Sequence, residues 1–119
     1  MEFKESKTYA NLLTAFAGES EARNKYTYYA EKAKKDGYVH IENIFNDTAR
    51  NEMAHAEIWF KLLHGGDIGS TDENLSDAAD GEHYEWSDMY ASFAETAKAE
   101  GYDRIAFLFA GVASIEREH

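Results

Sequence analysis

Two glutamates in the chain are each followed three residues later by a histidine: Glu52 with His55, and Glu116 with His119. Residues three apart lie on one face of an α-helix, so each carboxylate and its imidazole can reach a common point. Such a pair is a metal-ligand arrangement in which the carboxylate bridges two ions and the imidazole binds one. Because the chain has no cysteine, any metal here must be held by nitrogen and oxygen ligands.

Further carboxylates interrupt apolar stripes. Steps of three or four residues from Leu12 reach Glu19, and steps from Leu75 reach Glu82 and Glu85. The same rule places Glu52, His55, Glu116 and His119 on the core-facing line of their segments. Burying an unpaired carboxylate costs on the order of several kcal/mol, so something cationic must meet them. Arg23 is the one cation near these stripes and cannot neutralise five carboxylates, so two metal ions are expected.

The segments that carry these residues have helical periodicity. Apolar residues recur at helical spacing in four blocks, over residues 6–35, 40–64, 75–99 and 103–119, and residues 67–74 are predicted to form a loop. The chain has no proline, and glycines at 37, 65, 66 and 101 mark the breaks. We therefore predict an all-α protein, a four-helix antiparallel bundle that forms one domain over residues 1–119.

An internal repeat divides the predicted bundle into two related helical hairpins. The pattern from Tyr26 to Tyr38 returns 64 positions later from Tyr90 to Tyr102, and the Glu52/His55 pair returns at the same offset. A site on the pseudo-two-fold axis between the hairpins would receive similar ligands from each.

Charge and hydropathy limit the partners. The formal net charge of −11 disfavours nucleic acid and anionic membrane surfaces. No signal peptide and no stretch long enough to span a bilayer is found, so a soluble cytoplasmic protein is expected.

One glutamate from each of two helices and a Glu-x-x-His pair from each of the other two is the ligand pattern of ferritin-like di-iron proteins. Hard oxygen ligands with two imidazoles suit iron or manganese. Glu85 has an alternative interpretation as a solvated residue, because Glu82 already completes the minimal set. Tyr26 and Tyr90 lie near the site carboxylates and could donate to them, although a tyrosine stripe that also includes Tyr28 and Tyr29 is typical of core packing. His40, His64 and His83 lie off these lines and are expected at the surface.

Four segments resemble the ligand segments of rubrerythrins, and the resemblance covers essentially the whole chain. They are Ala17 to Tyr26, Asn51 to Ala56, Gly81 to Tyr90, and Glu116 to His119. The first segment and the Gly-Glu-x-x-Glu-Trp segment distinguish rubrerythrins from ferritins and bacterioferritins.

The resemblance implies a ferritin-like, non-haem di-iron peroxidase that reduces hydrogen peroxide to water in defence against oxidative stress. It implies that Glu52 and Glu116 bridge the irons, and that the terminal ligands are Glu19, Glu82, Glu85 and His119. It also implies that one iron exchanges between His55 and Glu85 with redox state, and that Tyr26 and Tyr90 are the neighbouring tyrosines. Manganese or a mixed metal pair stays an alternative.

Rubrerythrins usually carry a rubredoxin-like domain with four cysteines, which this sequence lacks. An external rubredoxin-like donor in an NADH-linked chain is therefore expected. His119 is the last residue, so the fourth helix is interpreted as truncated, or the hairpins exchange between two chains through the loop from Gly65 to Asn74. A homodimer is expected in either case. The alternatives are a ferritin-like ferroxidase that uses dioxygen, and a non-enzymatic helical interaction module whose acids are solvated.

Overall fold

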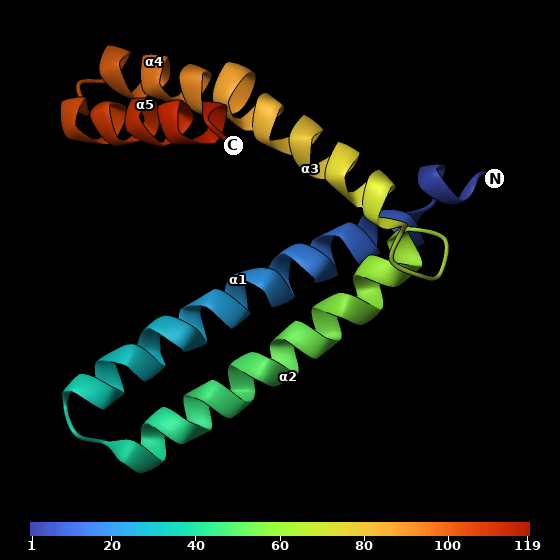
Figure 1. The fold of residues 1–119 in the computed structure, drawn as a ribbon, viewed down its shortest axis with the longest axis vertical. Helices are drawn as coiled ribbons and strands as arrows, with labels where there is room; N and C mark the ends of the chain where they lie inside the picture. The colour runs from blue at the N-terminus through green and yellow to red at the C-terminus, as the bar shows by residue number, and fades with distance from the viewer. The chain divides into compact units, whose positions relative to one another are not determined.

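The computed structural model describes all 119 residues, and they form two compact units, Met1–Ile68 and Gly69–His119. Each unit is a hairpin of antiparallel helices (Figure 1). We call them the first and the second hairpin. The chain contains helices and turns and no strand, which confirms the all-α class.

The first hairpin consists of a short 3₁₀ turn η1 (Phe3–Glu5) and the helices α1 (Lys7–Lys35) and α2 (Val39–Leu63). The Ser6 hydroxyl accepts a hydrogen bond from the Tyr9 backbone N–H and caps α1. At the tip, Gly37 has a positive φ of 83°, and the Tyr38 N–H donates to the Ala33 carbonyl at 2.9 Å. This left-handed glycine closes α1 and reverses the chain.

The second hairpin consists of α3 (Thr71–Tyr84), a π-helical turn η2 (Glu85–Met89), α4 (Tyr90–Ala99) and α5 (Asp103–Arg117). Its tip repeats the first one, because Gly101 has φ of 88° and the Tyr102 N–H donates to the Ala97 carbonyl at 2.8 Å. The 64-residue repeat predicted from the sequence therefore has a structural counterpart at both tips.

The third helix begins earlier than predicted. Residues 71–74 are helical, whereas the sequence interpretation assigned 67–74 to a loop. The Ser70 hydroxyl accepts a hydrogen bond from the Glu73 N–H at 3.2 Å, and Asp72 and Glu73 lie in the first turn. This Ser-x-x-Glu cap and its acidic first turn stabilise the start of a helix without any apolar periodicity.

Two other boundaries differ from the prediction. The block over residues 75–99 is interrupted by η2, where the Tyr90 N–H donates to the Glu85 carbonyl. The last helix ends at Arg117, and the His119 N–H donates to the Glu116 carbonyl at 3.2 Å to continue the last turn. Terminal turns tighten and fray in this way because their carbonyls lack intrahelical partners.

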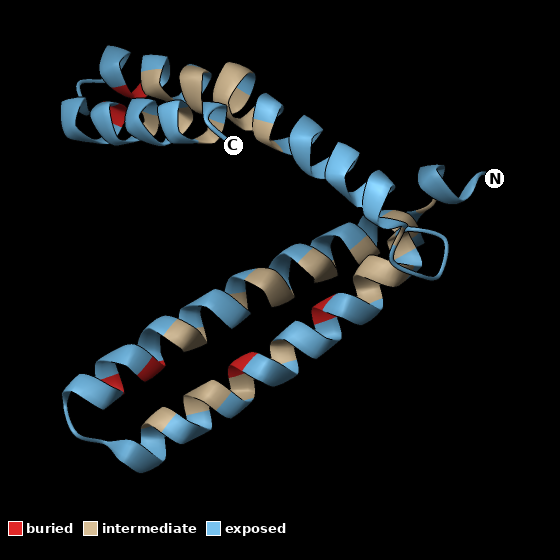
Figure 2. Cartoon of the chain, viewed as in Figure 1, coloured by how far each residue is buried: buried red, intermediate tan, exposed pale blue.

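Each hairpin has a narrow core made of small side chains. Alanines are the buried residues: Ala30, Ala33, Ala49 and Ala56 in the first hairpin, and Ala97 and Ala106 in the second (Figure 2). Small side chains let two helices approach closely. The large apolar side chains on the same helices are mostly half-buried or exposed, so a single hairpin does not enclose them. None of the helices combines the length and the apolar character that crossing a bilayer requires.

Candidate metal centre

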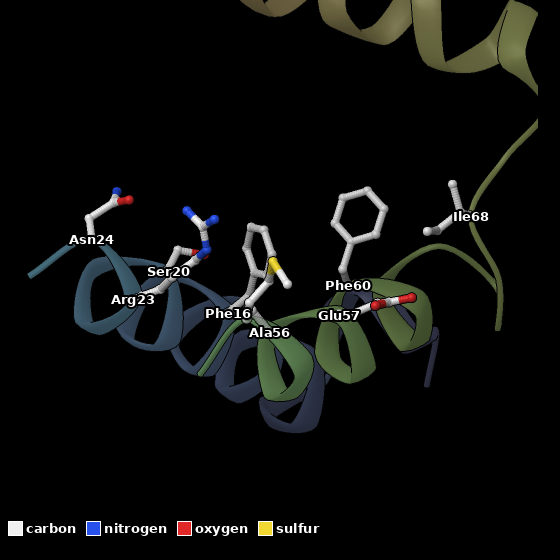
Figure 3. Close-up of a pocket in the computed structure, with 9 residues that line it drawn as sticks. Phe16, Ser20, Arg23, Asn24, Ala56, Glu57, Phe60 and Ile68 are labelled. Carbon is white, nitrogen blue, oxygen red and sulfur yellow. The ribbon is translucent and has the colours of Figure 1, made fainter. Parts of the chain in front are cut away.

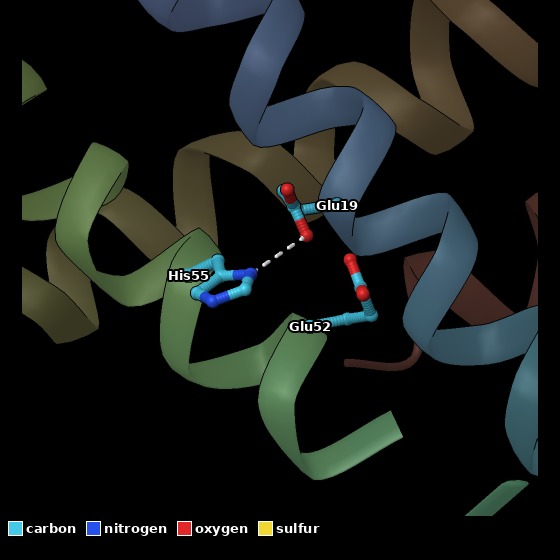
Figure 4. Close-up of side chains that lie close together, drawn as sticks. All are labelled: Glu19, Glu52 and His55. Atoms are coloured by element: carbon cyan, nitrogen blue, oxygen red, sulfur yellow. Dashed lines mark ion pairs between the residues drawn. The ribbon is translucent and has the colours of Figure 1, made fainter. Parts of the chain in front are cut away.

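Three predicted ligands meet in the first hairpin, and we call them the Glu19 group: Glu19 of α1 with Glu52 and His55 of α2. One ligand atom from each lies within 4.8 Å of the others (Figure 4). His55 Nδ1 lies 3.6 Å from Glu19 Oε2, and the two side chains are 52% and 26% exposed. The carboxylate is thus largely withdrawn between the helices, while the imidazole stands at the hairpin surface.

The second hairpin holds the matching Glu82 group, which consists of Glu82 of α3, Glu116 of α5 and His119. His119 Nδ1 lies 3.1 Å from Glu82 Oε2 and 3.6 Å from Glu116 Oε2. The His119 side chain is 53% exposed and that of Glu116 is 16% exposed. Both groups therefore place one half-exposed imidazole beside two carboxylates that are more deeply set.

Two carboxylate oxygens in these groups are buried without a hydrogen-bond partner: Glu19 Oε2 and Glu116 Oε2. Each lies 3.6 Å from the histidine Nδ1 of its own group, beyond hydrogen-bond distance. A buried carboxylate oxygen without a hydrogen bond is costly, so a cation is expected to meet it. The donor set of each group, two carboxylates and one imidazole, is the set that iron and manganese accept. The residues present therefore fit a metal ion at each group.

One carboxyl of the Glu19 group, that of Glu52, has a perturbed pKa. Glu19 raises the pKa of Glu52, first by hydrogen bonding to its protonated form, and desolvation and the negative charge of Glu19 act in the same direction. The nearby His55 opposes this shift. A bound cation would remove the repulsion and favour both ionised carboxylates.

Arg23, the one cation that the sequence places near these residues, makes no ion pair with either group. It lines a cavity of about 460 Å³ on the first hairpin together with Phe16, Met53 and Phe60 (Figure 3). None of the Glu19 group lines that cavity. Arg23 therefore does not neutralise the acids of the site, and the histidines of the two groups are the basic side chains beside them.

The remaining predicted site residues lie outside the two groups. Glu85 is half-buried at the start of η2, one turn after Glu82, and is not part of the Glu82 group. Tyr26 and Tyr90 are half-buried, and neither hydroxyl hydrogen bonds to a site carboxylate within its own hairpin. Their assigned roles stay predictions.

The two tyrosines instead show how closely the hairpins repeat each other. Tyr26 stacks on Phe45 with ring centroids 6.0 Å apart, and Tyr90 stacks on Phe109 at the same separation. The third ring of each cluster is Tyr29 in the first hairpin and Phe93 in the second. Each cluster fixes the register of its two helices beside the metal group.

The sequence interpretation missed one feature of the site, the π-helical turn η2 beside Glu85. A signal for it is present in the spacing. Gly18-Glu19 corresponds to Gly81-Glu82 at an offset of 63, whereas Tyr26 corresponds to Tyr90 at an offset of 64. One extra residue therefore lies between Glu82 and Tyr90.

Comparison with known proteins places this site in a family. Residues 10–119 match the profile of the rubrerythrin family. The chain is 47% identical to rubrerythrin-1 of Clostridium acetobutylicum and 49% identical to rubrerythrin of Nitratidesulfovibrio vulgaris, with 98% of this chain covered in both cases. The chain belongs to the rubrerythrin family. The resemblance recognised from the four ligand segments is thereby confirmed.

This rubrerythrin-family chain spans about two-thirds of the length of those relatives, 67% and 66% respectively. Among solved structures, a nigerythrin in its fully reduced, all-ferrous state is similar, with a TM-score of 0.49 and 33% identity over 93% of this chain and 62% of that one.

Proposed function

We propose that this chain is a non-haem di-iron peroxidase that reduces hydrogen peroxide to water. The observation that carries the proposal is the pair of matching groups, each with two carboxylates and one imidazole and each with a buried, unpartnered carboxylate oxygen. Membership of the rubrerythrin family supports iron as the metal. Manganese or a mixed pair would accept the same ligands.

Each residue has a proposed role. Glu52 and Glu116 would be the carboxylates that the two metals share, as the resemblance to rubrerythrins implies. Glu19, Glu82 and His119 would be terminal ligands. His55 and Glu85 would serve one metal in alternation, and Glu85 is proposed to approach the metals from the turn that follows Glu82.

When bound, the iron pair would supply two electrons to the O–O bond of peroxide without releasing a hydroxyl radical. The chain's own residues have separate tasks. The carboxylates orient and balance the charge of the metals, and the Tyr26 and Tyr90 hydroxyls would donate hydrogen bonds to carboxylates of the site. Apolar side chains around the groups would exclude water and thereby strengthen the metal–carboxylate contacts and the tyrosine hydrogen bonds.

The two groups are proposed to be halves of one centre. His55 lies on a line of α2 that also carries the exposed Ile41 and Ile44. His119, two residues past the end of α5, continues the matching line of that helix with Ile105 and Leu108. Exposed apolar lines of this kind need a covering surface. If the face that carries His55 packed against a face that carries His119, both lines of exposed apolar side chains would be buried. The ligands of the two groups would then lie together and suffice for two metal ions.

The short connection between the hairpins favours pairing between two copies of the chain. A ferritin-like bundle needs one crossover that runs the length of the bundle. With 25 residues, α2 is about 37 Å long. Residues 64–70 connect α2 to α3, and fully extended they span at most about 29 Å. We therefore propose a homodimer in which each centre takes one hairpin from each copy.

The electron source and the location are expectations of the same proposal. An external rubredoxin-like protein is proposed as the donor, in a chain that begins with NADH, and membership of the rubrerythrin family supports a donor of this kind. A cytoplasmic location stays a prediction.

The test is a comparison of oxidants. Anaerobic protein is loaded with two ferrous ions per chain, and its oxidation by hydrogen peroxide and by dioxygen is followed by stopped-flow absorption. Oxidation by peroxide that is faster by orders of magnitude supports the peroxidase. Equal or faster oxidation by dioxygen would support a ferroxidase instead, and failure to bind iron would favour a helical interaction module.

A further inference from the structure

The segment between Glu82 and Tyr90 carries one residue more than its counterpart in the first hairpin. Glu19 and Tyr26 are seven positions apart, and Glu82 and Tyr90 are eight. The glutamates of the two pairs occupy equivalent positions in their hairpins, and so do the tyrosines. Glu19 and Glu82 lie in the metal groups, and Tyr26 and Tyr90 stack on Phe45 and Phe109.

The π-helical turn η2 is where this extra residue is accommodated. In η2 the Tyr90 N–H donates to the Glu85 carbonyl, five residues back, instead of to a carbonyl four residues back. A π-turn inside an α-helix absorbs one additional residue without changing the direction of the helix on either side. Glu82 and Tyr90 thereby keep the register that Glu19 and Tyr26 have in a regular helix.

A side-chain hydrogen bond also lies in this segment. The Ser87 hydroxyl donates to the His83 carbonyl at 2.7 Å, four residues back. The Thr27 hydroxyl makes the same contact with the Arg23 carbonyl in the regular helix α1. The irregularity of the segment therefore lies in its backbone, where the Tyr90 N–H reaches the carbonyl five residues back.

Glu85 is the residue at which this turn begins, and Ala22 is its counterpart at the offset of Glu19 and Glu82. We propose that η2 is a hinge that lets Glu85 move toward and away from the Glu82 group while Glu82 and Tyr90 stay anchored. The proposal rests on the proposed function, in which Glu85 is the carboxylate that alternates with His55. The first hairpin has neither the extra residue nor the carboxylate, so the movable ligand belongs to the second hairpin alone.

The first hairpin indicates what removal of the hinge should do. There Glu19 and Tyr26 are seven positions apart, and at that spacing Glu19 lies in the metal group while Tyr26 stacks on Phe45. Deletion of Ser87 should give the second hairpin that same spacing and convert η2 into regular α-helix. The variant should fold, keep its helical circular dichroism, and melt without metal no lower than the wild type, because regular hydrogen bonds replace those of the π-turn.

The test is amide hydrogen exchange in the full-length protein. In the metal-free wild type, amides 86–90 should exchange about tenfold faster or more than amides 23–26, which serve as the internal reference. Deletion of Ser87 should remove that difference. The matched control is Ser87→Ala, which keeps the extra residue and loses only the hydroxyl, and in which amides 86–90 should stay fast.

A second readout connects the hinge to Glu85. Peroxide turnover should fall in the deletion variant to the level of Glu85→Ala, and the two changes combined should lower it no further. Equal protection of amides 86–90 and 23–26 in the wild type, failure of the deletion variant to fold, or additive losses would each overturn the hinge. A wild type that does not consume peroxide would refute the proposed function instead, and the exchange measurements would still decide whether the turn is a hinge.

Discussion

His119 Nδ1 lies 3.1 Å from Glu82 Oε2, although the two residues are 37 positions apart in the chain. The contact ties the end of α5 to α3, as His55 and Glu19 tie α2 to α1 at 3.6 Å. Ligands of opposite helices thus meet inside each hairpin. The groups can therefore be tested one by one.

The contact between Glu19 and Glu52, chiefly the hydrogen bond that Glu19 offers to protonated Glu52, predicts how stability depends on pH. Because the folded-state pKa of Glu52 is raised, folding favours its protonated form. That contribution is complete below the ordinary glutamate pKa of about 4.3 and is lost as the pH rises through the raised value. Metal-free Glu52→Gln should therefore melt a few degrees above the metal-free wild type at pH 7, and the difference should vanish near pH 4.

Bound metal should reverse the order of these two melting temperatures, so that the wild type melts above Glu52→Gln. Iron or manganese should raise the melting temperature of the wild type far more than that of Glu52→Gln, since a ligand that binds the native state stabilises it. Calorimetry at pH 7 with and without metal checks both statements. Equal melting temperatures of the two metal-free proteins at pH 7 would contradict the raised pKa of Glu52.

Replacement of Glu85 should separate metal binding from turnover. Glu85→Ala should still bind two metals at saturation, because the Glu19 and Glu82 groups are complete without it. Peroxide turnover should drop about tenfold or more as the alternating ligand is lost. The measurements are metal content and peroxide consumption under one set of conditions, and unchanged turnover would remove Glu85 from the mechanism.

The two tyrosines that pack on Phe45 offer a matched pair of variants. Tyr26→Phe removes the hydroxyl proposed to donate to the site, whereas Tyr29→Phe removes the hydroxyl of a ring that is 47% exposed. Both keep the ring packing, so both should melt close to the wild type. Turnover should fall roughly tenfold or more in Tyr26→Phe alone. Similar turnover in the two variants would argue that Tyr26 only packs.

Exchange of hairpins between copies predicts complementation. Glu52→Ala and Glu116→Ala each damage one hairpin, but a mixed dimer would contain one centre built from two intact hairpins. Unfolding the two variants together and refolding the equal mixture should recover about a quarter of the wild-type metal pairs. Each variant refolded alone should recover none. No recovery in the mixture would mean that both hairpins of a centre come from one chain.

The sequence was sufficient for the features that depend on local periodicity. The spacing of Glu52 and His55, the glycines at the hairpin tips and the repeat of the Tyr26 segment all predicted what the structure contains. All six residues of the two metal groups were among the predicted ligands.

The features that were missed depend on backbone hydrogen bonding rather than on apolar periodicity. The early start of α3 is set by the Ser70 cap, and the turn η2 is set by one extra residue whose effect is visible only when two offsets are compared. The sequence also predicts that the ligand side chains point into the core. Within their separate hairpins, however, His55 and His119 are about half exposed.

The Glu19 and Glu82 groups are proposed to be halves of one two-metal centre, and anaerobic titration of wild type, Glu52→Ala and Glu116→Ala with ferrous iron is the decisive measurement. We expect two tightly bound ions per chain in the wild type. Either variant should lose tight binding of both ions, because each removes a carboxylate that both ions are proposed to share. One tightly bound ion retained in each variant would contradict the shared centre, since the two groups would then be independent sites.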